Sequence, residues 1–164
     1  MIELGQYNDL TVAEKTVHGI YLSDGTEEEN ILLPEKELEC EIGDTLSVFL
    51  YIDNEERIMA TTDKPFGVVG DIVALEVEEI TDHGIYLLWG MKNDLFLPFS
   101  KQAEYRRIGQ KQVVRLVLDE DTERVIATTH LRGHLNPEVT DFAVNQKVVA
   151  QVYQAGEMGY DCLI

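Results

Sequence analysis

His18-Gly19-Ile20-Tyr21-Leu22 recurs unchanged as His83-Gly84-Ile85-Tyr86-Leu87. Three further blocks follow both copies in the same order: residues 31–34 with 95–98, 42–43 with 108–109, and 59–62 with 126–129. The offset between matching blocks stays between 64 and 67 residues. Self-similarity at a fixed period is typical of a chain built from copies of one structural unit. The sequence therefore predicts two units of about 65 residues each.

A third copy begins near the end of the sequence. Residues 148–153 alternate in the manner of a first strand, and Gly159-Tyr160 takes the position of Gly84-Ile85. We expect residues 1–65 and 66–135 to be two complete domains and 136–164 to be the start of a third, incomplete one. The alternative is a C-terminal tail that packs on the second unit. Connectors containing proline and glycine, at 63–67 and 132–137, separate the units.

Each complete unit is expected to hold five short strands. In the second unit these are residues 71–79, 85–89, 94–98, 112–118 and 124–129, and turn residues such as Asp82-His83-Gly84 and Asp119-Glu120-Asp121 lie between them. The segment 99–108 is the stretch with room for a helical turn. Short strands at this spacing indicate a small closed all-β barrel rather than a parallel sheet.

The repeated motif resembles a known family. The string Asp82-His83-Gly84-Ile85-Tyr86-Leu87 resembles the Asp-Phe-Gly-Ala-Phe-Val signature of the S1 domain, the OB-fold RNA-binding unit of ribosomal small-subunit protein one and of polynucleotide phosphorylase. Leu97-Pro98-Phe99-Ser100 is similar to the Val-His-Ile-Ser of that family. The resemblance implies an all-β chain of tandem five-stranded OB-fold barrels, two complete and a third truncated. The tandem of divergent copies is also similar to the bacterial conserved virulence factor B family.

The resemblance also implies a set of binding residues. In the family, two aromatic residues, a histidine, an aspartate and an arginine form the RNA-binding face, and stacking on aromatic rings holds single strands. The second unit matches this set with His83, Tyr86, Asp119 and Arg124, and the first unit with His18, Tyr21, Asp53 and Arg57. Pro34 and Pro98 stand at the histidine position, which removes a hydrogen-bonding group from both copies.

Each candidate has a structural alternative. Tyr21 and Tyr86 could pack across the barrel mouth. Arg57 and Arg124 follow acidic turns and could simply pair with them, an exposed contact worth about 0–1 kcal/mol. The two histidines sit in identical contexts, which equally suits a structural role in a turn.

The charge is unevenly distributed. The formal net charge is −18, which is unusual for a nucleic-acid-binding protein. Residues 1–65 carry 16 acidic and 4 basic side chains, whereas residues 66–135 carry 11 and 8. The basic side chains of the second unit gather around one segment, at Lys92, Lys101, Arg106, Arg107, Lys111 and Arg115. We therefore expect the second barrel to make most of the phosphate contacts.

The predicted function is non-enzymatic binding of single-stranded RNA, with a regulatory role in a bacterial cytoplasm. The sequence shows neither a nucleophile elbow nor a phosphate-binding loop, so we expect no catalysis, and we expect no cofactor, metal or membrane partner. No signal peptide is evident, and the densest apolar run, residues 47–52, has the length of a strand. The alternative function is an acidic protein-interaction scaffold that binds a basic protein partner, in which the barrels no longer contact nucleic acid.

Overall fold

The computed structural model describes residues 2–26, 30–35, 38–102, 106–131 and 142–164. Within these residues the chain consists of strands and one short 3-10 helix, η1 (Phe99–Lys101). None of the described residues forms a helix long and apolar enough to cross a membrane. The predicted connector at 132–137 lies outside the described residues.

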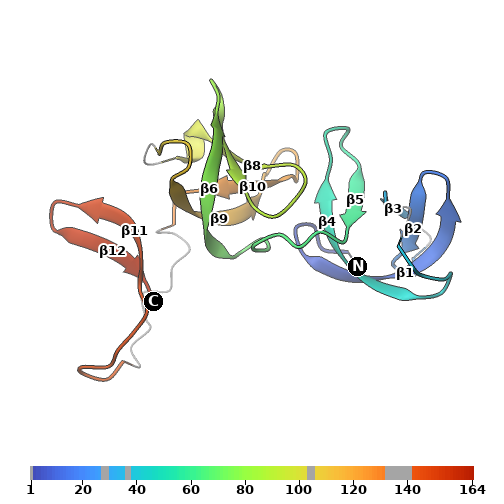
Figure 1. The fold of residues 1–164 in the computed structure, drawn as a ribbon, viewed down its shortest axis with the longest axis horizontal. Coiled ribbons are helices and arrows are strands. Elements are labelled where there is room, and N and C mark those ends of the chain that lie inside the picture. The colour runs from blue at the N-terminus through green and yellow to red at the C-terminus, as the bar shows by residue number, and fades with distance from the viewer. Residues whose placement is uncertain (1, 27–29, 36–37, 103–105, 132–141) are drawn as a thin grey trace.

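The strands form two closed barrels and a separate hairpin (Figure 1). The first barrel contains β1 (Tyr7–Thr16), β2 (Gly19–Ser23), β3 (Ile31–Leu33), β4 (Thr45–Ile52) and β5 (Ile58–Thr61). The second contains β6 (Ile72–Ile80), β7 (Gly84–Leu88), β8 (Leu95–Pro98), β9 (Lys111–Leu118) and β10 (Val125–Thr128). The hairpin contains β11 (Gln151–Gly156) and β12 (Gly159–Leu163). The predicted all-β class with two five-stranded barrels is confirmed.

The two barrels share one topology. Their strand orders are β1-β2-β3-β5-β4 and β6-β7-β8-β10-β9. All neighbours are antiparallel except β3 with β5 and β8 with β10, which are parallel. A register shift interrupts the first hairpin of each barrel at equivalent positions, between Val12 and Glu14 and between Val77 and Glu79. The repeat in the sequence is therefore a repeat of structure down to the position of the bulge.

Alternation along the strands fills each barrel with aliphatic side chains. Leu22 and Leu33 are fully buried in the first core, and Leu87 and Leu97 occupy the matching positions in the second. Each such side chain contributes about 1.5–3 kcal/mol on burial. The repeated motif Gly-Ile-Tyr-Leu is explained by this pattern, because its isoleucine and leucine are buried while the tyrosine stays partly exposed.

The glycine of the motif permits close approach of two strands. A Cβ atom on Gly84 would lie 2.5 Å from the carbonyl oxygen of Leu97 and 2.6 Å from Cε2 of Phe96. Gly19 has the same surroundings, with a Cβ only 2.3 Å from the carbonyl oxygen of Leu33, and its φ of +143° favours glycine. The second and third strands of each barrel can approach this closely because glycine stands here.

Gly84→Ala is expected to lower the unfolding free energy by about 3 kcal/mol, since the added methyl group overlaps the backbone of β8. Urea denaturation followed by far-UV circular dichroism measures the change. Gly109→Ala is the control, because at φ +82° with nothing within 4 Å it adds only backbone strain of about 1 kcal/mol. If Gly84→Ala were no less stable than the control, β8 would be free to move away at no cost.

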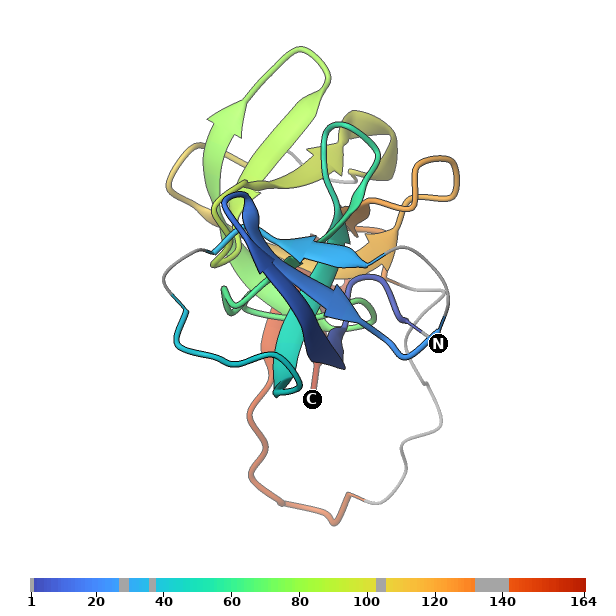
Figure 2. The same cartoon turned by 90° about the vertical axis from the view of Figure 1, so that its right-hand side faces the viewer.

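The two barrels are in direct contact through β4. Val48 and Leu50 are buried in the first core, whereas Phe49 belongs to the core cluster of the second barrel. Its ring meets the ring of Trp89 edge-on, with centroids 5.9 Å apart. Figure 1 shows the barrels side by side, and Figure 2 looks along the row with the first barrel in front. Both faces of β4 are thus covered, one by each barrel.

Hydrogen bonds reinforce the contact between the barrels. The amide of Val69 donates to the carbonyl of Gly5 at 2.9 Å, and the side-chain amide of Gln6 donates to the carbonyl of Val69 at 2.8 Å. The amide of Phe66 donates to the carbonyl of Trp89 at 2.7 Å. The connector is therefore held on both sides rather than acting as a free tether.

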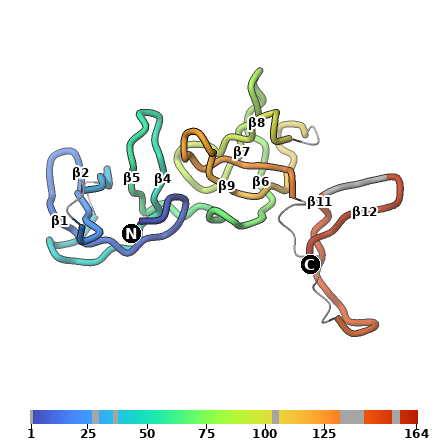
Figure 3. Tube along the Cα trace, turned by 180° about the vertical axis from the view of Figure 1, so that it is seen from behind, coloured from blue at the N-terminus to red at the C-terminus, as the bar shows by residue number. Residues whose placement is uncertain are grey.

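The hairpin β11–β12 repeats the start of a barrel. Its register shifts between Val152 and Gln154, as the first hairpins of both barrels do, and it turns at Gly159 with φ +132°. Its side chains are largely exposed, with Tyr160 at 74%. Seen from behind in Figure 3, it lies apart from the barrels, next to the second one. The hairpin thus has the form of the first two strands of each barrel, and the assignment of 136–164 to a third domain stays a prediction.

Candidate nucleic-acid interface

An aromatic pair lies on the outer face of the second barrel. Tyr86 on β7 is directly opposite Phe96 on β8 in the antiparallel ladder. Their ring centroids are 5.2 Å apart and the rings are tilted by 39°. Both side chains are partly exposed, so each can offer a ring face to a ligand. Pro98 follows on β8, opposite Gly84. The motif tyrosine is therefore part of a two-ring platform rather than a core residue.

The turn between β9 and β10 holds an arginine that lines one cleft together with this aromatic pair. Asp119 and Arg124 close the turn, with the amide of Asp119 donating to the carbonyl of Arg124 at 2.8 Å. The carboxylate of Asp119 accepts a hydrogen bond from the hydroxyl of Thr122 at 3.0 Å. The guanidinium of Arg124 instead reaches the first barrel, where Nη2 donates to the carbonyl of Asn54 at 3.3 Å. Its Nε has no partner among the described residues.

The equivalent arginine of the first barrel is neutralised locally. Arg57 donates from Nη2 and Nε to Oδ2 of Asp53 at 2.7 and 3.0 Å, and Nη1 lies 3.0 Å from Glu55. Partial burial alone would raise the pKa of Asp53, but hydrogen bonds from Arg57 and from the amide of Glu55 outweigh it and lower that pKa. The carboxylate thus stays ionised and Arg57 stays paired. Pairing with the adjacent acidic turn was the structural alternative for both arginines, and Arg57 makes that ion pair. Within the described residues Arg124 makes no ion pair.

One cleft lies on the first barrel, and a larger one lies where the second barrel meets the first. The first barrel has a cleft of about 480 Å³ that Tyr21 and Arg57 line. The second barrel has a cleft of about 650 Å³ that Tyr86, Phe96 and Arg124 line. The larger cleft lies between the barrels, because the first barrel supplies part of its lining, from Pro34, Glu35, Tyr51, Ile52, Asp53, Asn54, Thr61 and Asp63. The volume is within the range of small-molecule and nucleotide pockets, about 300–1,000 Å³.

The comparison with known families identifies the barrels. Residues 4–63 match the model of the S1 domain. The first barrel therefore matches the S1 domain over its whole set of strands. The second barrel repeats its strand order and its motif, so the chain carries tandem S1-type domains.

Two known proteins are similar to this chain. It is 32% identical over 107 residues to the uncharacterized protein YitL of Bacillus subtilis (strain 168), an alignment that covers 63% of this chain and 35% of YitL. The fold is also that of a multidomain protein with nucleic acid binding domains from Streptococcus pneumoniae, with a TM-score of 0.62 and 17% identity over 76% of this chain and 45% of that one. The chain thus spans less than half the length of either. The narrower resemblance to the conserved virulence factor B family stays a prediction.

The motif histidines lie outside both clefts. His18 and His83 are exposed in the turns between the first two strands of each S1-type domain. Their amides donate to the hydroxyl oxygens of Thr16 and Thr81 at 3.1 and 3.3 Å. This local bond accounts for the recurrence of the threonine in both turns, and it does not require a histidine side chain. The tyrosines and the histidines of the motif are therefore not brought together around one cleft.

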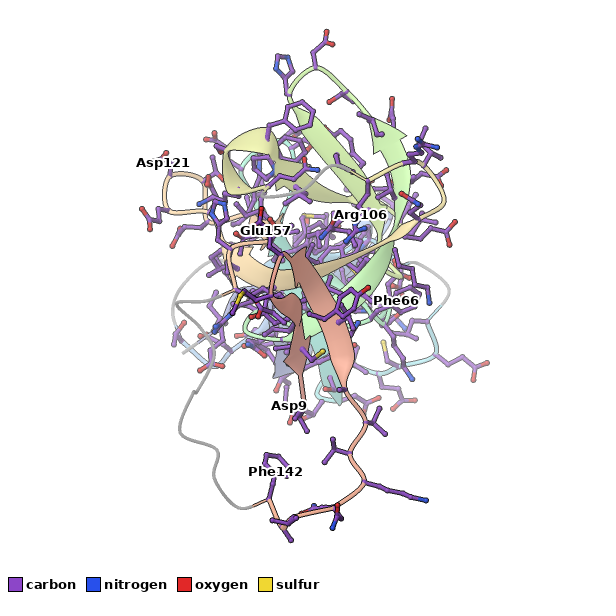
Figure 4. The ribbon with its side chains drawn as sticks, turned by 90° about the vertical axis from the view of Figure 1, so that its left-hand side faces the viewer. Asp9, Phe66, Arg106, Asp121, Phe142 and Glu157 are labelled. Carbon is purple, nitrogen blue, oxygen red and sulfur yellow. The ribbon has the colours of Figure 1, made fainter. Side chains whose placement is uncertain are left out.

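The basic residues of the second S1-type domain are divided between two places. Lys92 and Arg124 line the inter-barrel cleft. The other basic candidates do not line it; Lys101 ends η1, and the rest lie on β9 or just before it, at Arg106, Arg107, Lys111 and Arg115. Figure 4 shows Arg106 and Asp121, which belongs to the β9–β10 turn, on different sides of the barrel. Arg106 donates from Nε to the side chain of Gln112 at 3.3 Å.

Three aromatic residues of the larger cleft were not among the candidates from the sequence. Phe96 lies within a repeated block but stands where the first unit has Leu32, so the repeat does not mark it. Tyr51 and Trp89 lie outside the S1 signature altogether. The signal for Tyr51 was the apolar run at 47–52, in which the residues on both faces of the strand are apolar instead of those on one face alone. That run predicts a covered second face, although it does not name what covers it.

Proposed function

We propose that this chain binds single-stranded RNA, mainly through the second barrel, as a non-enzymatic regulatory protein. Nucleic acid binding is supported by the S1 domain at residues 4–63 and by the fold shared with a protein that has nucleic acid binding domains. The observation that carries the choice of the second barrel is the pairing of the Tyr86–Phe96 platform with Arg124, which makes no local ion pair in the described structure. Rings stack bases, and an arginine without a carboxylate partner meets phosphate.

Fluorescence anisotropy of a labelled ten-nucleotide RNA tests this proposal. If about three phosphates are contacted, raising salt from about 50 to 200 mM lowers the association constant about twentyfold, since each phosphate adds about −0.7 to the slope of log K on log salt. Arg124→Gln is expected to weaken binding and to reduce the slope by about 0.7. Affinity that does not change with salt would contradict the proposal.

Arg57→Gln is the matched control, because it removes the equivalent arginine from the first barrel. The ion pairs to Asp53 and Glu55 already neutralise Arg57, so RNA affinity is expected to change less than twofold. Equal losses of affinity for the two variants would mean that both barrels contact RNA. No loss for either variant would mean that neither arginine does. A larger loss for Arg57→Gln would move the proposed interface to the first barrel.

A basic protein partner for the first barrel is the second candidate. Residues 1–65 have a net charge of −12, and the ion pairs of Arg57 leave this domain without its motif cation. An acidic domain of this kind attracts a basic protein surface. Affinity capture with nuclease-treated extract tests the candidate. Recovery of the same basic proteins with and without RNA supports a scaffold role, and their loss after nuclease treatment contradicts it.

A further inference from the structure

The larger cleft is built by two barrels, which a single S1 domain cannot do. Tyr86, Phe96 and Asp94 line it from the second barrel, and Tyr51 and Asp63 from the first barrel and its end. The first barrel therefore provides a second wall for the face that the proposed function assigns to RNA.

The two walls are held in a fixed relation. Phe49 on β4 packs into the core of the second barrel, and Tyr51, two residues further along the same face of β4, packs against that core as well. Arg124 connects the rims of the cleft through its bond to the carbonyl of Asn54. A ligand in the cleft thus meets both barrels without requiring them to move together first.

Lys92 and Arg124 can meet phosphate at this cleft, and the rest of its lining suits a base. Aromatic side chains line it on both walls, with Tyr51 on one and Tyr86 and Phe96 on the other. The carboxylates of Asp63 and Asp94 also line it, and the described residues provide neither with a hydrogen-bonding partner. Ionised carboxylates repel phosphate but accept hydrogen bonds from an exocyclic amine, as they do from the N4 amine of cytosine.

We propose that the inter-barrel cleft holds one base of the bound strand and favours bases with an exocyclic amine over uracil. This inference rests on the proposed function and adds base selectivity to it. The base stacks on the platform of Tyr86 and Phe96, and its amine donates to Asp94 or to Asp63 across the cleft. Uracil presents a carbonyl oxygen at the position where cytosine has its amine, so the carboxylates repel it.

Competition between oligo-cytidine and oligo-uridine ten-mers in the anisotropy assay tests the inference, since the two strands are both pyrimidines with the same backbone. Wild-type protein is expected to bind oligo-cytidine about tenfold more tightly. The Asp63→Asn/Asp94→Asn variant is expected to reduce this preference to about twofold, because an amide can also donate to the uracil carbonyl. Tyr51→Ala is expected to weaken oligo-cytidine more than oligo-uridine.

Asp9→Asn/Asp121→Asn is the matched control, because it also removes one carboxylate from each barrel, at exposed positions that do not line the cleft (Figure 4). It is expected to raise the affinity for both strands equally and to keep the tenfold ratio. Equal affinity of the wild-type protein for both strands, with binding still dependent on Tyr86, would overturn the inference and leave the proposed function standing. Failure to bind either strand at low salt would overturn both.

Discussion

Replacing Tyr86 with alanine is expected to lower the affinity for single-stranded RNA by about tenfold to a hundredfold. Loss of one base–aromatic stack costs about 1–3 kcal/mol. The ring of Tyr86 is half of the platform formed with Phe96, at a centroid distance of 5.2 Å. Anisotropy titration at low salt measures the loss, and far-UV circular dichroism verifies that the variant is folded.

Two further variants separate stacking from other causes. Tyr86→Phe keeps the ring and is expected to bind within about twofold of the wild type, because stacking uses the ring face rather than the hydroxyl. Tyr21→Ala removes the equivalent ring of the first barrel, where Leu32 replaces Phe96 as the cross-strand neighbour, and is expected to cost less than threefold. If Tyr86→Ala bound RNA as well as the wild type does, the contact would lie elsewhere on the chain.

The sequence predicted the fold well because the internal repeat, the alternation of apolar residues and the turn residues all indicated the same five-stranded unit. The repeat identified the unit, alternation identified the strands, and the repeated His-Gly turn identified the first hairpin of each barrel. The repeated glycine could be recognised as special, although its reason, the carbonyl oxygens of Leu33 and Leu97 against Gly19 and Gly84, needs coordinates.

The candidate site was predicted less completely, because it depends on contacts between the repeats. Arg57 and Arg124 look equivalent in the sequence, since each follows an acidic turn. One is paired with Asp53 and the other reaches across to Asn54. Alternation within a unit cannot reveal that difference, because it arises from the placement of the second barrel against the first.

Arg115 illustrates the same limit. In the second barrel Arg115 on β9 lies opposite Ile72 on β6. In the first barrel Phe49 on β4 lies opposite Tyr7 on β1. Arg115 and Phe49 therefore occupy equivalent positions in the two barrels. In the first barrel that position faces the next unit along the chain. The sequence grouped Arg115 with basic residues expected near the groove, whereas the structure places it on the strand face that the first barrel uses to join its neighbour.

Replacing Trp89 with alanine is expected to lower the unfolding free energy of the second barrel by about 3–5 kcal/mol. Trp89 is only 6% exposed, its indole donates to the carbonyl of Asn93 at 2.7 Å, and its ring meets Phe49 of the first barrel. The loss combines a core cavity with the loss of the contact between barrels. Because this is the sole tryptophan, denaturation of the variant must be followed by far-UV circular dichroism instead of fluorescence.

A double-mutant cycle isolates the part of this loss that belongs to the inter-barrel contact. Phe49→Leu and Trp89→Leu keep apolar volume on both sides, and the coupling energy between them is expected to be about 1 kcal/mol, as for other edge-on aromatic pairs. Such coupling means that the first barrel stabilises the second and that the cleft keeps both walls. A coupling energy of zero would mean that the barrels are joined without mutual stabilisation. The first barrel would then contribute charge near the cleft but no fixed wall, and Tyr51→Ala would not change base preference.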